Sequence, residues 1–153
     1  MTEEQRTQIV ALLRKAYNME LETVCNYTAQ SINLDGFKAK HIKDALAADI
    51  TEELTHAQTI AKRIKVLEGI VPGSQELEMT QTDMQPNGDA LDVVAVINGV
   101  IAAEDSAINH YQAIIDATDG IDPVTEDLCV TLKGDEEEHK RLFKGFLAEA
   151  MQS

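Results

Sequence analysis

The chain has 153 residues, and 44% of them are hydrophobic, which is enough to bury one continuous core, so we predict a single domain over residues 1–153. The formal net charge of −14 excludes a surface for nucleic acid or for an anionic membrane, because both are polyanions that would repel the protein. Three prolines, eight glycines and no tryptophan, with abundant Ala, Leu and Glu, favour an all-α fold.

The first predicted helix begins at the N-terminus. Thr2, with Gln5 three residues later, is typical of a capping box, and the helical pattern continues until Asp35-Gly36. This N-terminal sequence lacks a basic stretch followed by an apolar one, so we expect no secretory signal and a cytoplasmic protein.

The second predicted helix runs from near Phe37 to Gly69, where the glycine would adopt the left-handed conformation and Pro72 prevents continuation. Little periodicity remains from about Ile70 to Gly88, which we interpret as a linker of roughly 20 residues.

Asp89 is the predicted cap of a third helix that extends to about Thr118, and Asp122 caps a fourth helix with Pro123 at its first position. The short first and third connections predict antiparallel neighbours. The long second connection can cross the length of the bundle and make helices two and three parallel. The sequence therefore predicts an antiparallel four-helix bundle with one long crossover.

Each predicted helix carries an apolar stripe with a spacing of three and four residues, and one acid interrupts each stripe near its middle. These four acids are Glu20, Glu53, Glu104 and Glu136. His56 and His139 follow the second and fourth acids by three residues, about 4.5 Å along the helix axis, so each can reach the same cluster as its glutamate. Glu22 is turned about 200° from Glu20, and we expect it to face solvent.

An ionised carboxylate in an apolar interior is strongly disfavoured, and four together would also repel one another. A hydrogen-bonded glutamate or a wrongly phased helix could explain one position, but not four. Two divalent ions would neutralise four carboxylates. A mixed set of carboxylate and imidazole ligands favours iron, with manganese or zinc as substitutes.

These residues belong to short motifs that resemble those of the ferritin superfamily, closest to bacterioferritins and bacterioferritin-related Dps-like proteins. The motifs are Glu20-Leu21 with Tyr27, the run 53–57 followed by 63–64 and 67–69, and the run 135–139. The resemblance covers all four helices and implies a ferritin-like fold. The superfamily pattern itself is a Glu from each of two helices and Glu-x-x-His from each of two others.

The resemblance also implies a role for each residue. Glu20 and His56 would hold one iron, and Glu104 and His139 the other. Glu53 and Glu136 would bridge the two ions. Tyr27 would be an electron donor near the site, or alternatively a core tyrosine whose hydroxyl meets a stripe carboxylate.

The implied activity is oxidation of Fe²⁺ by O₂ or H₂O₂, with storage of ferric iron in an oligomeric shell. One alternative is a rubrerythrin-like or Dps-like di-iron peroxidase for oxidative-stress defence without bulk storage. The missing CxxC pairs weigh against a complete rubrerythrin. Another alternative is a helical interaction module with vacant carboxylates.

Two departures from the family pattern concern haem and shell size. Leu54 stands where bacterioferritins carry the methionine that ligates haem, so we expect no haem. The chain extends about 14 residues beyond His139, which leaves no room for the short fifth helix of 24-subunit ferritins. A homo-oligomer of 12 subunits is therefore favoured over one of 24.

The remaining cysteines and histidines lie outside the predicted cluster. We expect Cys25 and Cys129 to be buried structural thiols. Parallel first and fourth helices would place them about 18 Å apart along the axis, which excludes a disulfide between them. We expect His41 and His110 at the surface or at an interface.

Overall fold

The computed structural model of the chain describes residues 1–152. Within this range the chain forms four long α-helices and no strand. They are α1 (Glu3–Asn33), α2 (Lys40–Val66), α3 (Val93–Thr118) and α4 (Pro123–Ala150), with short 3-10 turns η1 (Phe37–Ala39) and η2 (Ser74–Glu76). None of the described helices combines the length and the apolar character needed to span a bilayer.

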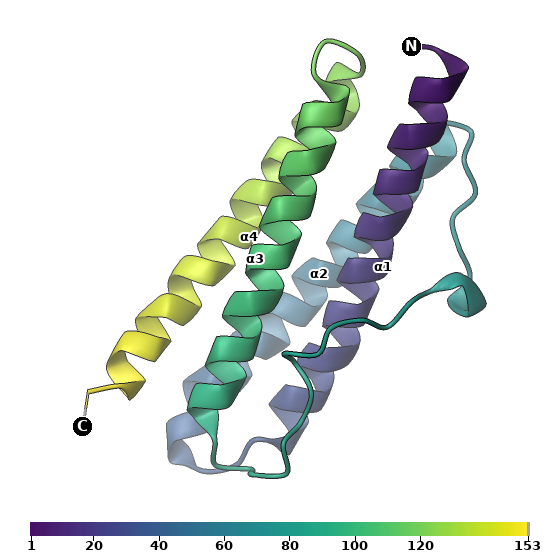
Figure 1. The fold of residues 1–153 in the computed structure, drawn as a ribbon. Coiled ribbons are helices and arrows are strands. Elements are labelled where there is room, and N and C mark those ends of the chain that lie inside the picture. Colours follow the sequence, from purple (N-terminus) through teal and green to yellow (C-terminus); the bar gives the residue numbers. More distant parts are fainter. Residues whose placement is uncertain (153) are drawn as a thin grey trace.

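The helices are arranged as two antiparallel hairpins, α1 with α2 and α3 with α4 (Figure 1). The long segment between α2 and α3 returns along the outside of α1, so that α2 and α3 point the same way (Figure 1). The predicted all-α, ferritin-like four-helix bundle with one crossover is confirmed.

The helix starts follow their predicted caps at two of three places. Thr2 and Gln5 form the complete capping box, with distances of 2.8 Å and 3.1 Å between backbone nitrogen and side-chain oxygen. Asp122 accepts a hydrogen bond from the backbone N–H of Thr125 at 3.2 Å, next to Pro123. These polar side chains satisfy backbone donors that a helix start leaves unpaired.

The predicted start of the third helix was wrong by three residues. Asp92, not Asp89, caps α3, and it accepts from the backbone N–H of Ala95 at 3.0 Å. Asp89 accepts instead from the backbone N–H of Leu91 in the preceding turn. Aspartate competes for local backbone donors in turns as well as at helix caps, so two nearby aspartates leave the start ambiguous.

The end of α2 also differs slightly from the prediction. The left-handed residue is Glu68, with φ of 64°, and not Gly69 as predicted. Glycine at position 69 lets the chain after α2 pass close to α1, because a Cβ there would lie 2.6 Å from Cγ1 of Val10. At the other end of α2, the 3-10 turn from Phe37 precedes the α-helix, which begins at Lys40.

The apolar core consists of two clusters separated along the bundle. One includes Ile9, Leu13, Ile60, Ile64 and Ile114. The other includes Leu34, Leu46, Ile97, Val100 and Phe143. Each buried aliphatic or aromatic side chain contributes about 1.5–3 kcal/mol of burial free energy. The polar residues near the middle of the stripes lie between these two clusters.

The crossover is held to α1 by a row of side chains that we call the crossover ladder. Its members recur every four residues of α1 and are Arg14, Asn18, Glu22, Asn26 and Gln30. Their partners in the crossover are, in the same order, the Glu76 carboxylate, the Glu78 backbone, the Gln81 backbone N–H, the Gln81 side chain and the Met84 carbonyl. The sixteen residues of α1 from Arg14 to Gln30 rise about 24 Å, and eight residues, the separation of Glu76 and Met84, span about 26 Å when extended, so the two segments cover similar lengths although the partners are unevenly spaced.

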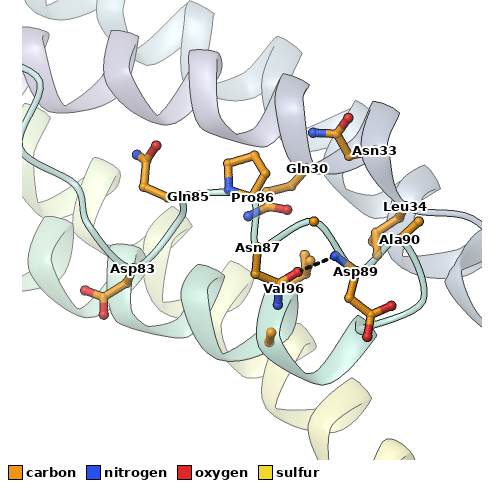
Figure 2. A pocket seen from close by; sticks show the side chains of 12 residues that line it. Gln30, Asn33, Leu34, Asp83, Gln85, Pro86, Asn87, Asp89, Ala90 and Val96 are labelled. Atoms are coloured by element: carbon orange, nitrogen blue, oxygen red, sulfur yellow. Dashed lines mark hydrogen bonds between the residues drawn. The ribbon is translucent and has the colours of Figure 1, made fainter.

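Beyond the ladder the crossover bends over the end of α1. Figure 2 shows Gln30 and Asn33 of α1 near the loop residues Pro86 and Asn87, beside a cavity of about 360 Å³. Asn87 accepts a hydrogen bond from the backbone N–H of Asp89 at 2.9 Å (Figure 2). This cavity lies at the loop and does not include the glutamates of the stripes.

Candidate metal centre

The structure brings all six predicted ligands together in the middle of the bundle. Each helix contributes its stripe glutamate, and α2 and α4 add a histidine three residues later. The exposed fractions are 1–2% for the glutamates, 4% for His56 and 6% for His139. The four helices therefore bury a carboxylate and imidazole cluster between the two apolar clusters.

The six residues form two overlapping groups of four. Within each group, one ligand atom per residue lies within 4.8 Å of the others. The first group is Glu20, Glu53, His56 and Glu136, and the second is Glu53, Glu104, Glu136 and His139. Glu53 and Glu136 belong to both groups, which is the arrangement expected of two carboxylates shared by two neighbouring ions.

Several atoms of the cluster are buried and have no hydrogen-bond partner. They are Glu20 Oε2, Glu53 Oε1, Glu104 Oε2, Glu136 Oε1, His56 Nδ1 and His139 Nδ1. Leaving a buried polar atom unpaired costs about 1–3 kcal/mol, and more if it is charged. Each of the six residues contributes one such atom, so the set fits a bound metal, and its mixed oxygen and nitrogen donors fit iron.

The two histidines are oriented by acids outside the six. Nδ1 of each ring faces the cluster, and Nε2 faces outward. His56 Nε2 lies 3.0 Å from Asp135 Oδ2, and His139 Nε2 lies 2.7 Å from Glu52 Oε2 and 3.4 Å from Asp49. A carboxylate on the far nitrogen sets the tautomer and ring orientation of a metal-binding histidine.

The pKa values of Glu104, His56 and His139 are all raised within the cluster. Burial raises the pKa of Glu104 to about 8. Burial lowers the pKa of His56, but the neighbouring carboxylates of Glu136 and Glu53 outweigh it and raise it to about 10. Burial likewise lowers the pKa of His139, and Glu104 and Glu136 outweigh it, so that its pKa is raised. Without a metal, these groups retain protons that a bound cation would displace.

Two tyrosines donate hydrogen bonds into the cluster. Tyr27 of α1 donates its hydroxyl to Glu104 Oε1, and Tyr111 of α3 donates to Glu20 Oε1. Both rings are at most 1% exposed, and burial raises the pKa of both phenols well above the usual value. Both phenols are therefore neutral donors. Tyr27 is thus a core tyrosine whose hydroxyl meets a stripe carboxylate, as one of its two predicted roles requires.

Three predictions about neighbouring residues were wrong. Glu22 is 2% exposed, because the crossover covers it and the Gln81 backbone N–H donates to it at 2.6 Å. His110 is 9% exposed, with Nε2 2.8 Å from the Leu12 carbonyl oxygen. Cys25 is exposed on α1, whereas Cys129 is buried as predicted, and both thiols are free. His41 is exposed as predicted.

Sequence reasoning missed four residues around the cluster, namely Asp49, Glu52, Asp135 and Tyr111. The sequence held a signal for two of them. Asp49 precedes Glu53 by one helical turn, and Tyr111 follows Glu104 by seven residues, as Tyr27 follows Glu20. Glu52 and Asp135 are half-exposed and adjacent to a predicted ligand, so only the packing of α2 against α4 selects them.

A one-crossover bundle that buries two overlapping groups of carboxylates and imidazoles defines a class of metal-binding four-helix proteins. Within it, this chain belongs to the ferritin family, since the Ferritin-like domain matches residues 10–152. It is also similar to the DNA protection during starvation protein of Pyrococcus furiosus, with 26% identity over 144 residues that cover 92% of this chain and 77% of that protein.

Solved structures support the same assignment. The dodecameric thioferritin of Bacteroides fragilis, a bacterioferritin-related protein, aligns with a TM-score of 0.86 and 26% identity over 95% of this chain and 87% of its own. The bacterioferritin of Desulfovibrio desulfuricans aligns with a TM-score of 0.80 and 22% identity over 95% and 81%. A ferritin-like diiron-carboxylate protein of Bacillus anthracis aligns with a TM-score of 0.83 and 17% identity over 96% and 99%. The last two show the shared fold.

Proposed function

We propose that the chain is a ferroxidase, which oxidises Fe²⁺ at the central cluster and stores ferric iron inside a homo-oligomeric shell. The supporting observation is the pair of overlapping four-residue groups that share Glu53 and Glu136 and have an unpartnered buried atom in each member. Four carboxylates balance two divalent cations in charge.

In this proposal, each residue keeps the role implied by the family resemblance. Glu20 and His56 hold one Fe²⁺, Glu104 and His139 hold the other, and Glu53 and Glu136 bridge them. Two shared carboxylates would keep the two Fe²⁺ ions close enough for both electrons to pass to one oxidant molecule. Two Fe²⁺, one O₂ and two protons then give two Fe³⁺ and one H₂O₂; with H₂O₂ as oxidant, the products are two Fe³⁺ and two H₂O.

The shell we propose has 12 subunits and no haem. The name of the Bacteroides fragilis relative describes a dodecamer, and that protein is 26% identical to this chain. Leu54 is an exposed apolar residue on α2 and lacks the thioether that would ligate haem iron. The net charge of −14 would attract Fe²⁺ and repel DNA, so the proposed function does not include the DNA protection in the name of the Pyrococcus furiosus protein.

A di-iron peroxidase for oxidative-stress defence is the second candidate, and the similarity to a starvation-protection protein favours it. The two functions differ in the preferred oxidant and in the fate of iron. A storage ferroxidase retains many ferric ions per subunit in soluble form. A peroxidase consumes H₂O₂ much faster than O₂ and leaves excess ferric iron to precipitate outside the protein.

The proposal is tested by adding Fe²⁺ to the apo-protein in air and with H₂O₂ under anaerobic conditions. Oxidation is followed by ferric absorbance, and retained iron and mass by size-exclusion chromatography with light scattering. We expect saturable oxidation at two Fe²⁺ per chain, a soluble ferric core and a dodecamer mass. Binding of fewer than two metal ions per chain would refute the dinuclear site, and precipitation of all added iron would refute storage.

A further inference from the structure

The turn between α1 and α2 is basic, in contrast to the rest of the chain. Residues 36–43 contain three of the 13 Lys and Arg residues of the sequence and none of its 27 Asp and Glu residues. Lys38, Lys40 and His41 are exposed. Within residues 1–152, Lys38 makes no ion pair, and Lys40 pairs only with the exposed Asp44, at 3.4 Å between Nζ and Oδ2. The turn is therefore a basic patch on a protein whose net charge is −14.

The local structure does not account for these positive charges. No side chain caps the start of α2, and its first turn contains no acid. Positive charge near a helix N-terminus is unfavourable, because it opposes the helix dipole. Lys43 has a structural role, since its Nζ donates to the Leu34 carbonyl oxygen at 2.7 Å. Lys38 and Lys40 have no such role, and they would be stabilised by a negatively charged surface lying against them.

Two exposed apolar side chains adjoin the basic residues. Phe37 is 89% exposed and Leu91 is 68% exposed. The segments that carry them are in contact, because the backbone N–H of Asp35 donates to the Ala90 carbonyl oxygen at 2.8 Å. A Cβ on Gly36 would lie 3.3 Å from Cδ2 of Leu91. The turn and the start of α3 thus occupy the same end of the bundle (Figure 1), which presents apolar side chains next to basic ones.

The turn is held in place by the bundle itself. Ala39 is fully buried, and its backbone N–H donates to the Gly36 carbonyl oxygen at 3.2 Å. Of the three phenylalanines, Phe143 and Phe146 pack in a core cluster, whereas Phe37 does not. An aromatic side chain buries about 150–250 Å² when it is covered. A rigid turn that displays such a ring loses little conformational entropy on binding a partner.

A second copy of this chain has the chemistry that the turn requires. Copies with a net charge of −14 repel one another, so assembly requires contacts in which positive groups of one copy meet carboxylates of the next. Duplex DNA would accept the lysines, but its polar surface would not cover the apolar side chains. Two identical basic turns would repel each other, so the turn must meet a different, acidic patch of the partner. Such a heterologous contact repeats from copy to copy and closes a ring or shell.

We propose that residues 36–43 and Leu91 of one copy dock on an acidic, partly apolar patch of a second copy. Phe37 and Leu91 are covered in this contact, and Lys38 and Lys40 lie against carboxylates of the partner. The inference rests on the homo-oligomer of the proposed function and assigns a surface that holds it together.

The test measures the native mass of the full-length apo-protein over a dilution series, by size-exclusion chromatography with light scattering. Phe37→Ser should raise the protein concentration at which the oligomer dissociates by at least about 10-fold, as expected when an aromatic anchor of an interface is truncated. Lys38→Glu combined with Lys40→Glu should also weaken assembly, because the reversed charges would face carboxylates.

The matched controls lie at the other end of α2. Val66→Ser changes an exposed apolar residue, and Lys62→Glu combined with Lys65→Glu reverses two exposed charges. Both controls should assemble as the wild type does, and circular dichroism checks that every variant folds. Equal weakening in the controls would refute a specific role for the turn.

The remaining outcomes separate this inference from the proposed function. If the wild type is oligomeric and the turn variants dissociate no more readily, the inference is wrong and the proposed shell stands. If the double lysine variant loses binding to duplex DNA while its mass is unchanged, the turn is a nucleic-acid surface and the inference is again wrong. A wild-type chain that stays single at every concentration would overturn the proposed shell and the inference together.

Discussion

The central cluster and the crossover ladder both draw acidic or amide side chains of α1 into buried surroundings, but they use them differently. Glu20 and Glu22 are two residues apart and equally buried, at 2% exposed. One oxygen of Glu22 accepts a backbone hydrogen bond from Gln81, and among the described residues Glu22 joins no group of three potential metal ligands. Glu20, in contrast, lies close to three other potential metal ligands, Glu53, His56 and Glu136. Burial of a carboxylate therefore does not identify a metal ligand, whereas its neighbours do.

The largest difference between the cluster and the ladder should come from removing a proposed shared ligand of the cluster. Glu53→Ala should lower the rate of Fe²⁺ oxidation by more than about 100-fold, because loss of an outer partner alone costs about 10- to 100-fold. The apo-variant should still fold, since the two apolar clusters on either side of the site are unchanged. Stopped-flow absorbance with circular dichroism as the folding control measures both. Wild-type oxidation by this variant would show that the cluster is not the reaction site.

The next effect concerns the acids that orient the histidines. Asp135→Asn removes the charged acceptor 3.0 Å from His56 Nε2 and should weaken metal binding by about 10- to 100-fold. Glu137→Gln removes the same charge from an exposed position on the same helix and should change the affinity little. Equal losses in both variants would mean that the helix charge, and not the His56 contact, controls affinity.

Metal binding itself should stabilise the bundle through the cluster. Mn²⁺ or Zn²⁺ at a concentration 100 times its dissociation constant should add about 2.7 kcal/mol to the free energy of unfolding for each site that it occupies. For a chain of this size, that corresponds to a rise in Tm of roughly 5–11 °C. Chelation should reverse the shift, and Glu53→Ala should abolish it. A shift of equal size in that variant would place the stabilising metal elsewhere.

The stability of the apo-protein should fall as pH rises. The pKa of Glu104 is raised from 4.5 to about 8, so the folded chain binds more protons than the unfolded chain between these values, and stability decreases through that window. The pKa of His56 is raised from 6.5 to about 10, and its contribution is lost as pH rises through that range. Urea unfolding should therefore show a less stable apo-protein at pH 9 than at pH 6. The opposite slope would contradict this electrostatic description.

The smallest effect should come from the ladder and should be confined to stability. Glu22→Ala leaves the Gln81 backbone N–H without its acceptor and should cost about 1–3 kcal/mol of unfolding free energy. Glu22→Gln retains an acceptor and serves as the matched control. Iron oxidation should remain near wild type in both, as measured by the stopped-flow assay. A loss of oxidation comparable to that of Glu53→Ala would erase the distinction between ladder and cluster.

Local signals explain which parts of the fold were predictable. Thr2 with Gln5, and Asp122 with Pro123, are caps whose partners lie within a few residues, and both were confirmed. Asp89 and Asp92 offer the same local chemistry three residues apart, so the local sequence did not distinguish between them as the cap of α3. The helix period placed the stripe glutamates and histidines in the interior, and their burial agrees with it.

By itself, the sequence determined the helices, the one-crossover order and the face on which each stripe glutamate lies, because these depend on periodicity and on contacts within a few residues. Only the tertiary structure decided which distant residues contact the polar side chains in and around the cluster. It buried Glu22 under Gln81, paired Asp135 with His56 and directed Tyr111 across the bundle to Glu20. Such contacts join residues about 60–90 positions apart, and no local pattern specifies which distant partner a polar side chain will meet.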